Sequence, residues 1–132
     1  GVKDNLIDVI VSDHKPEDEE SKRLTFAQAA TGASGIETLL SLSLELYHNE
    51  TLKLETIIKA LTSNPAKILK INKGNLSVGN DADFCIVDIN KPWIVKQENL
   101  ISKSKNTSIE NKKLQGRVTN TFVKGEELFK LN

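Results

Sequence analysis

The first apolar cluster of the chain is a short unbroken run, the Val-Ile-Val of residues 9–11. A continuous run of this kind is typical of a strand covered on both faces, as in a parallel sheet. Pro16 disfavours helix at the residue before it, so the strand is expected to end near Ser12 or Asp13. Asp13 is then either a catalytic acid at the end of a barrel strand or a simple turn cap.

After Gly35 the apolar residues follow a helical period. They are Ile36, Leu39, Leu40, Leu42, Leu44 and Leu46. Ser34 with Glu37 three residues later forms a capping box, which predicts a helix from there to about Tyr47. His48 falls in the last turn, where a cationic imidazole is favoured, and is interpreted as a helix-terminal residue rather than a metal ligand.

Two further helices are predicted between Thr51 and Gly74. Apolar side chains at positions 54, 57, 58 and 61 form one helical face. Pro65 is expected at the first position of a third helix with Asn64 as its N-cap. Gly74 is expected to close that helix in the left-handed conformation.

Beyond residue 74 the pattern becomes that of β-structure. Residues 84–89 and 118–123 are rich in strand-forming side chains, and Pro92 opens another short strand over 92–95. The Lys-Gly-Glu-Glu of residues 124–127 predicts a hairpin turn, after which Leu128-Phe129 returns. A strand, then helices, then antiparallel strands does not make one self-contained layered domain. The order predicts an α/β chain, the end of a barrel followed by a small β unit.

Composition narrows the function classes. Lys plus Arg and Asp plus Glu both number 18, so net charge does not favour nucleic acid or an acidic membrane as partner. Cys85 is the only cysteine, which excludes a disulfide framework and fits a reducing cytoplasm. No apolar run approaches the ~20 residues of a membrane span. The chain starts at Gly1 and contains no Met, so it is expected to be a piece of a longer protein.

Three polar loops are candidates for binding. Residues 17–23 form either a solvated loop with compensating charges or a mobile loop over a site at the strand end. The two glycines in residues 31–35 allow a backbone to approach a ligand closely. The lysines in residues 103–108 suggest anion binding, although a solvated loop is the simpler interpretation.

Several motifs together carry a family resemblance. They are Ser-Asp-His-Lys-Pro at 12–16, Gly-Ile-Glu-Thr at 35–38, Thr-Ser-Asn-Pro-Ala-Lys-Ile at 62–68 and Gly-Asn-Asp-Ala-Asp-Phe at 79–84. In this order and spacing they resemble the C-terminal third of a dihydroorotase, a member of the cyclic-amidohydrolase superfamily. The loop at 102–107, followed by Gly-Arg-Val at 116–118, is more similar to dihydroorotase than to hydantoinase or allantoinase.

The resemblance implies a particular architecture. Residues 1–73 would be the C-terminal end of a (β/α)8 TIM barrel, with its last strand and the helices that follow. Residues 74–132 would form a small β-sandwich-type domain with a return segment toward the barrel. The whole protein would hold one or two zinc ions, with the other ligands outside this chain.

The resemblance also implies an activity, the reversible hydrolysis of dihydroorotate to N-carbamoyl-L-aspartate in de novo pyrimidine biosynthesis. Asp13 matches the aspartate that binds metal and carries a proton from the attacking hydroxide to the ring nitrogen. This role suits a carboxylate within hydrogen-bond reach of both groups. Thr31 and Gly32 fall where the family has Phe-Gly, whose backbone contacts the substrate.

The sequence departs from the family pattern at two places. Glu17 stands where the family has a histidine that binds the substrate carboxylate, and a carboxylate there would repel it. Either Lys15, Lys22 or Arg23 replaces that histidine, or substrate binding is weakened. The family's Asn-Thr-Pro-Phe reads Asn-Thr-Ser-Ile at 106–109. Because the chain also lacks a His-x-His pair, it is expected to be inactive alone.

Three functions remain open on the sequence. The chain is part of an active dihydroorotase, of a non-catalytic dihydroorotase-like structural partner of aspartate transcarbamoylase, or of a hydantoinase- or allantoinase-type cyclic amidase. The expected partners are a small-molecule substrate, the N-terminal remainder of the same protein and further copies in a homo-oligomer. Neither nucleic acid nor a membrane is expected.

Overall fold

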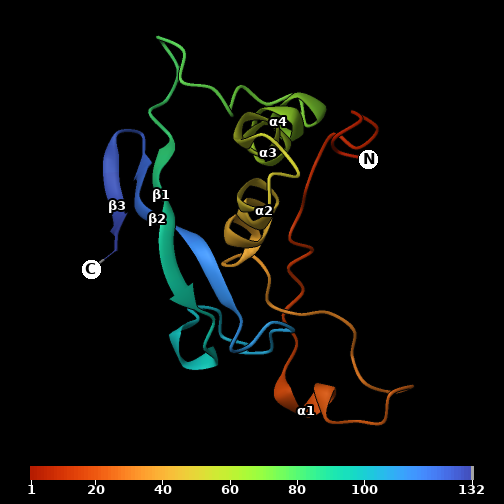
Figure 1. Cartoon of the computed structure of the whole chain (residues 1–132). Helices are drawn as coiled ribbons and strands as arrows, with labels where there is room; N and C mark the ends of the chain where they lie inside the picture. The colour runs from red at the N-terminus through yellow and green to blue at the C-terminus, as the bar shows by residue number, and fades with distance from the viewer. Residues whose placement is uncertain (132) are drawn as a thin grey trace.

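A computed structural model describes residues 1–131 as a mixed α/β unit with one antiparallel sheet (Figure 1). Its elements are α1 (Glu19–Lys22), α2 (Leu39–His48), α3 (Leu54–Leu61), α4 (Ser63–Ile68), β1 (Phe84–Ile94), the 3-10 turn η1 (Gln97–Asn99), β2 (Lys113–Val123) and β3 (Glu126–Lys130). In Figure 1 the N-terminal segment runs past α4, α3 and α2 toward α1, while the sheet lies on the other side of α2. In this part of the chain, no helix has the length and apolar character that crossing a membrane requires.

The sheet has the order β1-β2-β3, with both pairs antiparallel. The two short strands predicted over 84–89 and 92–95 are one irregular strand, β1. Pro92 lies inside β1, where the register with β2 shifts between Asp88 and Pro92. A proline cannot donate to the ladder, so an irregular position of this kind is where a strand tolerates it. The predicted hairpin is confirmed, since β3 follows β2 directly after Lys124-Gly125.

The core lies between α2 and the sheet. Three side chains there are almost completely buried: Leu44 of α2 (1% exposed), Val95 just after β1 (0%) and Leu114 of β2 (4%). Ser41 joins the two layers, because its hydroxyl donates to the Gly116 carbonyl at 2.5 Å and accepts from Trp93 Nε1 at 3.1 Å. Packing of α2 on β2 therefore fixes the helices relative to the sheet.

The prediction of a strand over residues 9–12 is wrong, because this structure has no strand there. The segment has no strand ladder, and Val11 is 70% exposed instead of buried. Its backbone contacts are the Ile10 N–H donating to the Ala60 carbonyl at 3.1 Å and, further on, a single parallel bridge between His14 and Ala33. A parallel strand needs strands beside it, and the described residues place none next to this segment.

The loop predicted over 17–23 contains the short helix α1. Asp18 caps it, since its carboxylate accepts a hydrogen bond from the Ser21 N–H at 2.7 Å. Hydrogen bonding from Ser21 holds the pKa of Asp18 below its usual value. The acidic residues that suggested a loop are thus the first-turn residues of a helix, where acids are favoured.

Two predicted helix caps are wrong. Ser34 and Glu37 do not form a capping box, because α2 begins only at Leu39 and both side chains bind a distant loop. Asn64 lies inside α4, which begins at Ser63, and its amide donates to the Asp8 carbonyl at 2.8 Å. In both cases the polar side chain finds a tertiary partner instead of its own helix end.

The remaining helix predictions fare better. The helical face predicted from residue 54 is α3, with Ile57 fully buried. His48 is the last residue of α2, as predicted, and its Nε2 lies 3.0 Å from the Ile89 carbonyl. Gly74 has the predicted positive φ of 75°, but Lys70 (φ 54°) is the left-handed residue nearest the end of α4. The second sheet of a β-sandwich is absent from the described residues, and the division at residue 73 stays a prediction.

Candidate active site

Three polar segments meet at the end of the N-terminal stretch, around an open hollow of about 1000 Å³. The first contains His14 to Glu19, the second is α1, and the third is the loop at 102–106. Figure 1 shows the 102–110 loop reaching across to the chain just before α1. Residues far apart in the sequence therefore form one surface here.

Asp13 immediately precedes His14, the first lining residue, in the sequence, and does not itself line the hollow. The residue is exposed and adopts a left-handed backbone conformation, with φ of 44°. Such a conformation is uncommon for residues other than glycine and concentrates at turns and functional sites. The geometry therefore presents the Asp13 carboxylate at a sharp bend, open to groups outside the described residues.

His14 is used structurally. Its Nδ1 accepts hydrogen bonds from the backbone N–H groups of Gly35 at 3.1 Å and Ile36 at 3.3 Å. An Nδ1 that accepts two hydrogen bonds has no lone pair left for a metal ion. The ring instead ties the Asp13 bend to the residues just before α2.

Gly32 lies directly against this bend. Its φ is 120°, and a Cβ at this position would be 2.5 Å from the Lys15 carbonyl oxygen. The adjacent Lys15 N–H donates to the Ala33 carbonyl at 3.1 Å. The predicted substrate-binding residues Thr31 and Gly32 are thus held beside the Asp13 segment, with Thr31 exposed.

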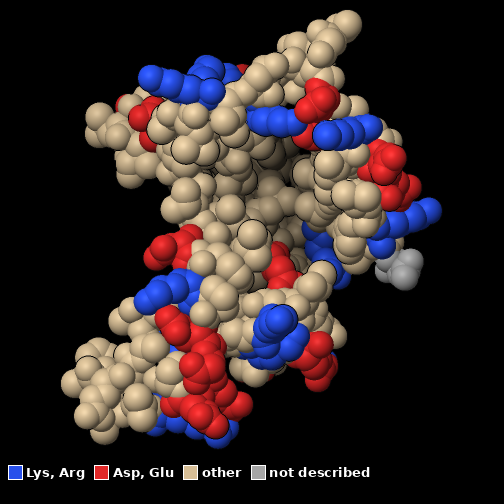
Figure 2. All heavy atoms as spheres, turned by 180° about the vertical axis from the view of Figure 1, so that it is seen from behind, with Lys and Arg blue, Asp and Glu red and all other residues tan. Residues whose placement is uncertain are grey.

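Glu17 lines the hollow but its charge is compensated. The Lys15 ammonium lies 3.3 Å from the Glu17 carboxylate, whose side chain is 25% exposed. Arg23 pairs with Glu19 on α1 in the same way. Figure 2 shows acidic and basic side chains close together at the lower end of the molecule, where Figure 1 places α1.

The sequence-based interpretation missed the hydrogen bonds that connect the 102–106 loop to this site. The Ser34 hydroxyl lies 3.1 Å from the Ser102 hydroxyl and donates to the Ser104 carbonyl at 2.9 Å, and the Ser34 N–H donates to the Asn106 carbonyl at 2.7 Å. The Asn106 amide donates to the Gly32 carbonyl at 3.1 Å. The only sequence feature that pointed to this loop was the asparagine at 106, which matches the family pattern. It did not indicate that its hydrogen-bond partner is Gly32.

Glu37 anchors the other end of the same loop. Its carboxylate accepts from the N–H of Ile101 at 2.9 Å and from the N–H of Ser102 at 2.9 Å. A carboxylate that accepts backbone N–H bonds is a strong acceptor. The motif at 35–38 therefore positions the 102–106 loop rather than reacting itself.

Within residues 1–131, no group of three or more His, Cys, Asp or Glu side chains is placed to hold a metal ion. Zinc sites in proteins use three or four protein ligands. Asp13 can supply one carboxylate ligand, and Cys85 lies on β1 rather than beside the hollow. A complete metal site therefore needs ligands from other residues.

The motif at 79–84 has a structural role. Asp83 accepts from the Lys124 N–H at 2.7 Å and pairs with the Lys73 ammonium at 2.5 Å, and Asp81 pairs with the same ammonium at 2.7 Å. The Lys73 ammonium and the Lys124 N–H hold the pKa of Asp83 below its usual value. These contacts connect the hairpin turn to the segment before β1.

Comparison with known proteins agrees with this arrangement. Residues 1–128 match the Amidohydrolase family. The chain is 41% identical over 130 residues to the dihydroorotase of Ehrlichia chaffeensis and 41% identical over 129 residues to that of Wolbachia sp. subsp. Drosophila simulans. Each match covers 98% of this chain and 29% of the relative, so the chain spans less than a third of the length of these proteins.

Solved structures show the same fold. The L-hydantoinase of Arthrobacter aurescens superposes with a TM-score of 0.90 at 30% identity, and the dihydropyrimidinase of Brevibacillus agri with 0.91 at 20%. Both matches cover 98% of this chain and 30% of the other. The fold and the relatives place this chain among mixed α/β proteins that resemble parts of dihydroorotases and hydantoinases. More particularly, the chain belongs to the Amidohydrolase family.

Proposed function

We propose that this chain is the C-terminal portion of a metal-dependent dihydroorotase, which hydrolyses dihydroorotate reversibly to N-carbamoyl-L-aspartate in pyrimidine biosynthesis. The observation that carries the proposal is the 38–41% identity, over 98% of the chain, to proteins of this name from Ehrlichia, Wolbachia and Anaplasma. In this proposal the whole protein would work in the cytoplasm as a homo-oligomer.

In this proposal, residues 1–73 are the end of a (β/α)8 barrel and residues 74–132 form the small β domain. The extended segment at 9–12 becomes the last barrel strand once neighbouring strands from the N-terminal remainder pair with it. The absence of a pairing strand among the described residues and the 70% exposure of Val11 fit a strand whose neighbours lie outside this chain.

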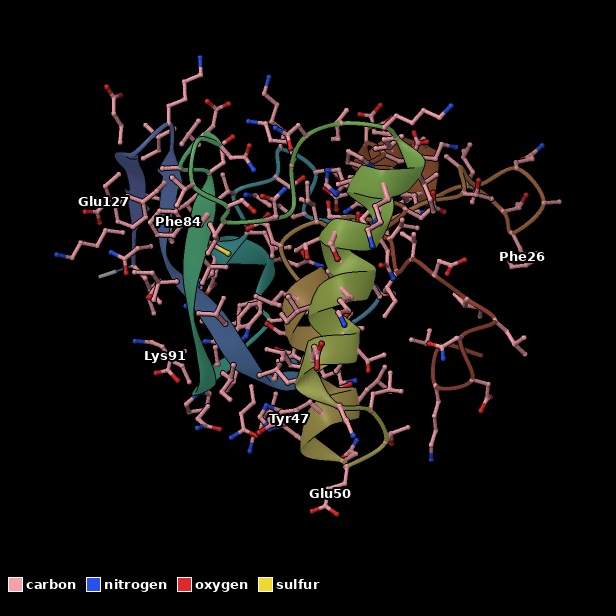
Figure 3. All side chains as sticks on the ribbon, turned by 90° about the horizontal axis from the view of Figure 1, so that it is seen from above. Phe26, Tyr47, Glu50, Phe84, Lys91 and Glu127 are labelled. Carbon is pink, nitrogen blue, oxygen red and sulfur yellow. The ribbon has the colours of Figure 1, made fainter. Side chains whose placement is uncertain are left out.

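The exposed apolar side chains support the same view. Leu6, Val11, Phe26, Ile36, Leu76, Val78, Ile101 and Leu128 are each more than half exposed. Figure 3 shows Phe26 at the tip of the loop after α1, pointing away from the rest of the chain. Large exposed apolar areas mark surfaces that another part of a protein covers. The N-terminal remainder is the partner that the proposal assigns to them.

Asp13 is the proposed catalytic acid–base and a metal ligand. Asp13 is the one ligand that the proposal assigns within the described residues, so the other ligands of one or two zinc ions would come from the N-terminal remainder. A zinc ion lowers the pKa of bound water toward ~7 and so supplies hydroxide at neutral pH. Asp13 would take the proton released during attack on the ring carbonyl and deliver it to the leaving nitrogen.

Thr31, Gly32 and Glu17 are the proposed substrate-binding residues. The exposed Thr31 and the half-buried Gly32 lie beside the Asp13 segment, where a substrate ring amide could bind. Glu17 stands where a carboxylate-binding group is expected, and its pairing with Lys15 lowers the repulsion that a free carboxylate would cause.

The test uses the full-length protein with zinc. We expect turnover of dihydroorotate and little turnover of hydantoins. Asp13→Asn should lower kcat by about 10²–10⁴-fold, because it removes the proton carrier. Asp88→Asn is the matched control, because Asp88 is an exposed residue of β1 away from the hollow. This variant should retain activity. A wild-type protein that binds zinc but leaves dihydroorotate unchanged would refute the proposed reaction.

Two other functions have specific support. A hydantoinase-type amidase is favoured by the likeness to the Arthrobacter aurescens enzyme, with a TM-score of 0.90 at 30% identity, and predicts turnover of hydantoins instead. A non-catalytic partner of aspartate transcarbamoylase is favoured by Glu17 and predicts a stable complex without turnover. The substrate assay and co-purification with aspartate transcarbamoylase separate these outcomes.

A further inference from the structure

The ammonium of Lys22 makes contacts that the proposed chemistry does not require. Lys22 ends α1 and is half-buried beside the hollow. Its Nζ donates to the Ala30 carbonyl at 2.6 Å and to the Gly32 carbonyl at 2.9 Å. These two carbonyls lie on either side of Thr31, so one side chain holds the backbone that is offered to the substrate.

Two carboxylates that line the hollow with Lys22 are engaged by other cations, and Asp18 accepts from the Ser21 N–H. Glu17 pairs with Lys15, and Glu19 pairs with Arg23. Among the described residues, Lys22 takes part in no carboxylate pair. Its charge is therefore directed at backbone carbonyls, and hydrogen bonds from a charged donor are stronger than those from a neutral one.

Asn106, which lies in a loop far from Gly32 along the chain, donates to the same carbonyl as Lys22. Its Nδ2 donates to the Gly32 carbonyl at 3.1 Å, while its own carbonyl accepts from the Ser34 N–H at 2.7 Å. A carbonyl oxygen has two lone pairs, so Lys22 and Asn106 together saturate it. Gly32, with φ of 120°, would otherwise be free to change conformation.

We propose that Lys22 and Asn106 are positioning residues that fix the loop at residues 30–36 before substrate binds. The inference rests on the proposed function for what the loop contacts. The clamp, by which we mean the hydrogen bonds from Lys22 and Asn106 to the carbonyls of Ala30 and Gly32, is observed directly. Holding a binding backbone in its productive geometry in advance lowers the entropy lost on binding. It also explains what the asparagine at 106 does in the loop that departs from the family at 108 and 109.

The first test measures backbone amide exchange in the full-length protein. Lys22→Met should speed exchange of the peptide spanning residues 30–36 by about tenfold, because local opening becomes easier. Lys22→Arg, which keeps the charge and donors, should preserve most of the protection. The control is Lys59→Met, which removes a lysine paired with Glu55 on α3 and should leave this peptide unchanged. Unchanged exchange in Lys22→Met would overturn the inference.

Asn106→Asp is a second variant of nearly equal size that loses the donor to Gly32. It too should speed exchange over 30–36, and wild-type protection in this folded variant would remove Asn106 from the proposal. Both tests are independent of catalysis. A wild-type protein without dihydroorotase activity would therefore refute the proposed function while the exchange result still decides the clamp.

The kinetic test separates positioning from a general structural role. In an active full-length enzyme, Lys22→Met should raise KM for dihydroorotate about tenfold and change kcat by less than about threefold, because ground-state and transition-state binding weaken together. Lys22→Arg should bring KM back to within about threefold of wild type. A fall in kcat with KM unchanged would contradict the inference.

Discussion

Gly116 lies where α2 packs on β2, and its conformation makes that contact possible. Its φ is 96°, and a Cβ would be 2.3 Å from Leu44 Cδ1. Leu44 is 1% exposed, so it has little room to move away. The Gly116 carbonyl also accepts from Ser41, and the neighbouring Arg117 guanidinium lies 4.9 Å from the Trp93 ring centroid. The glycine of the Gly-Arg-Val motif at 116–118 is thus needed for the close packing of α2 on β2.

Gly116→Ala is expected to lower the free energy of unfolding of the full-length protein by about 2–4 kcal/mol, from backbone strain plus overpacking. Gly79→Ala is the control, because Gly79 has a similar φ of 94° but nothing within 4 Å of its Cβ position. That variant should lose only about 1 kcal/mol. Urea unfolding measures both, and equal losses would show that the contact with Leu44 is unimportant.

At the scale of elements, side chains at the ends of helices and strands connect one element to another. Asp83, just before β1, holds the β2–β3 turn through Lys124 and the segment after α4 through Lys73. The periodicity of the sequence predicted the buried face of α3, but in α2 it predicted only the helix, whose buried residues are Ser41, Ser43 and Leu44. It could not predict their caps, because Ser34 and Glu37 bind the 102–106 loop instead of the start of α2.

Asp83 predicts a pH dependence of stability. The folded-state pKa of this carboxyl is lowered by Lys73 and by the Lys124 N–H, so its contribution is present above the unfolded pKa of about 3.9 and is lost as pH falls through the folded pKa. Asp83→Asn should therefore be less stable than wild type at pH 6, with the difference narrowing toward pH 3. Thermal unfolding across this range measures it. Asp88→Asn serves as the control, and a constant difference would contradict the assignment.

At the scale of the whole molecule, many large apolar side chains are exposed among the described residues. Ile57 and Val95 are fully buried, whereas Phe26 is 101% and Val78 106% exposed. The exposed residues lie on the N-terminal segment, around the helices and on the sheet, so no single face accounts for them. The proposal that an N-terminal remainder covers these surfaces explains their distribution.

A polypeptide of residues 1–132 should accordingly bind a hydrophobic dye such as ANS strongly, while the full-length protein should bind it weakly. Fluorescence titration at equal molar concentration measures the difference. Replacing Val78 and Leu128 by serine in the short polypeptide should reduce dye binding without loss of helical circular dichroism. Equal dye binding by the short and full-length forms would argue against a covering segment.

The sequence by itself determined the helical periods, the antiparallel hairpin and the motifs of the Amidohydrolase family, because these depend on residues close together along the chain. Tertiary structure decided the partners of its polar residues. Ser34 binds Ser104, 70 residues away, and Asn106 binds Gly32, 74 residues away. It also decided that residues 9–12 form no strand, because a strand forms only beside another strand, and no pattern within the segment itself supplies that neighbour.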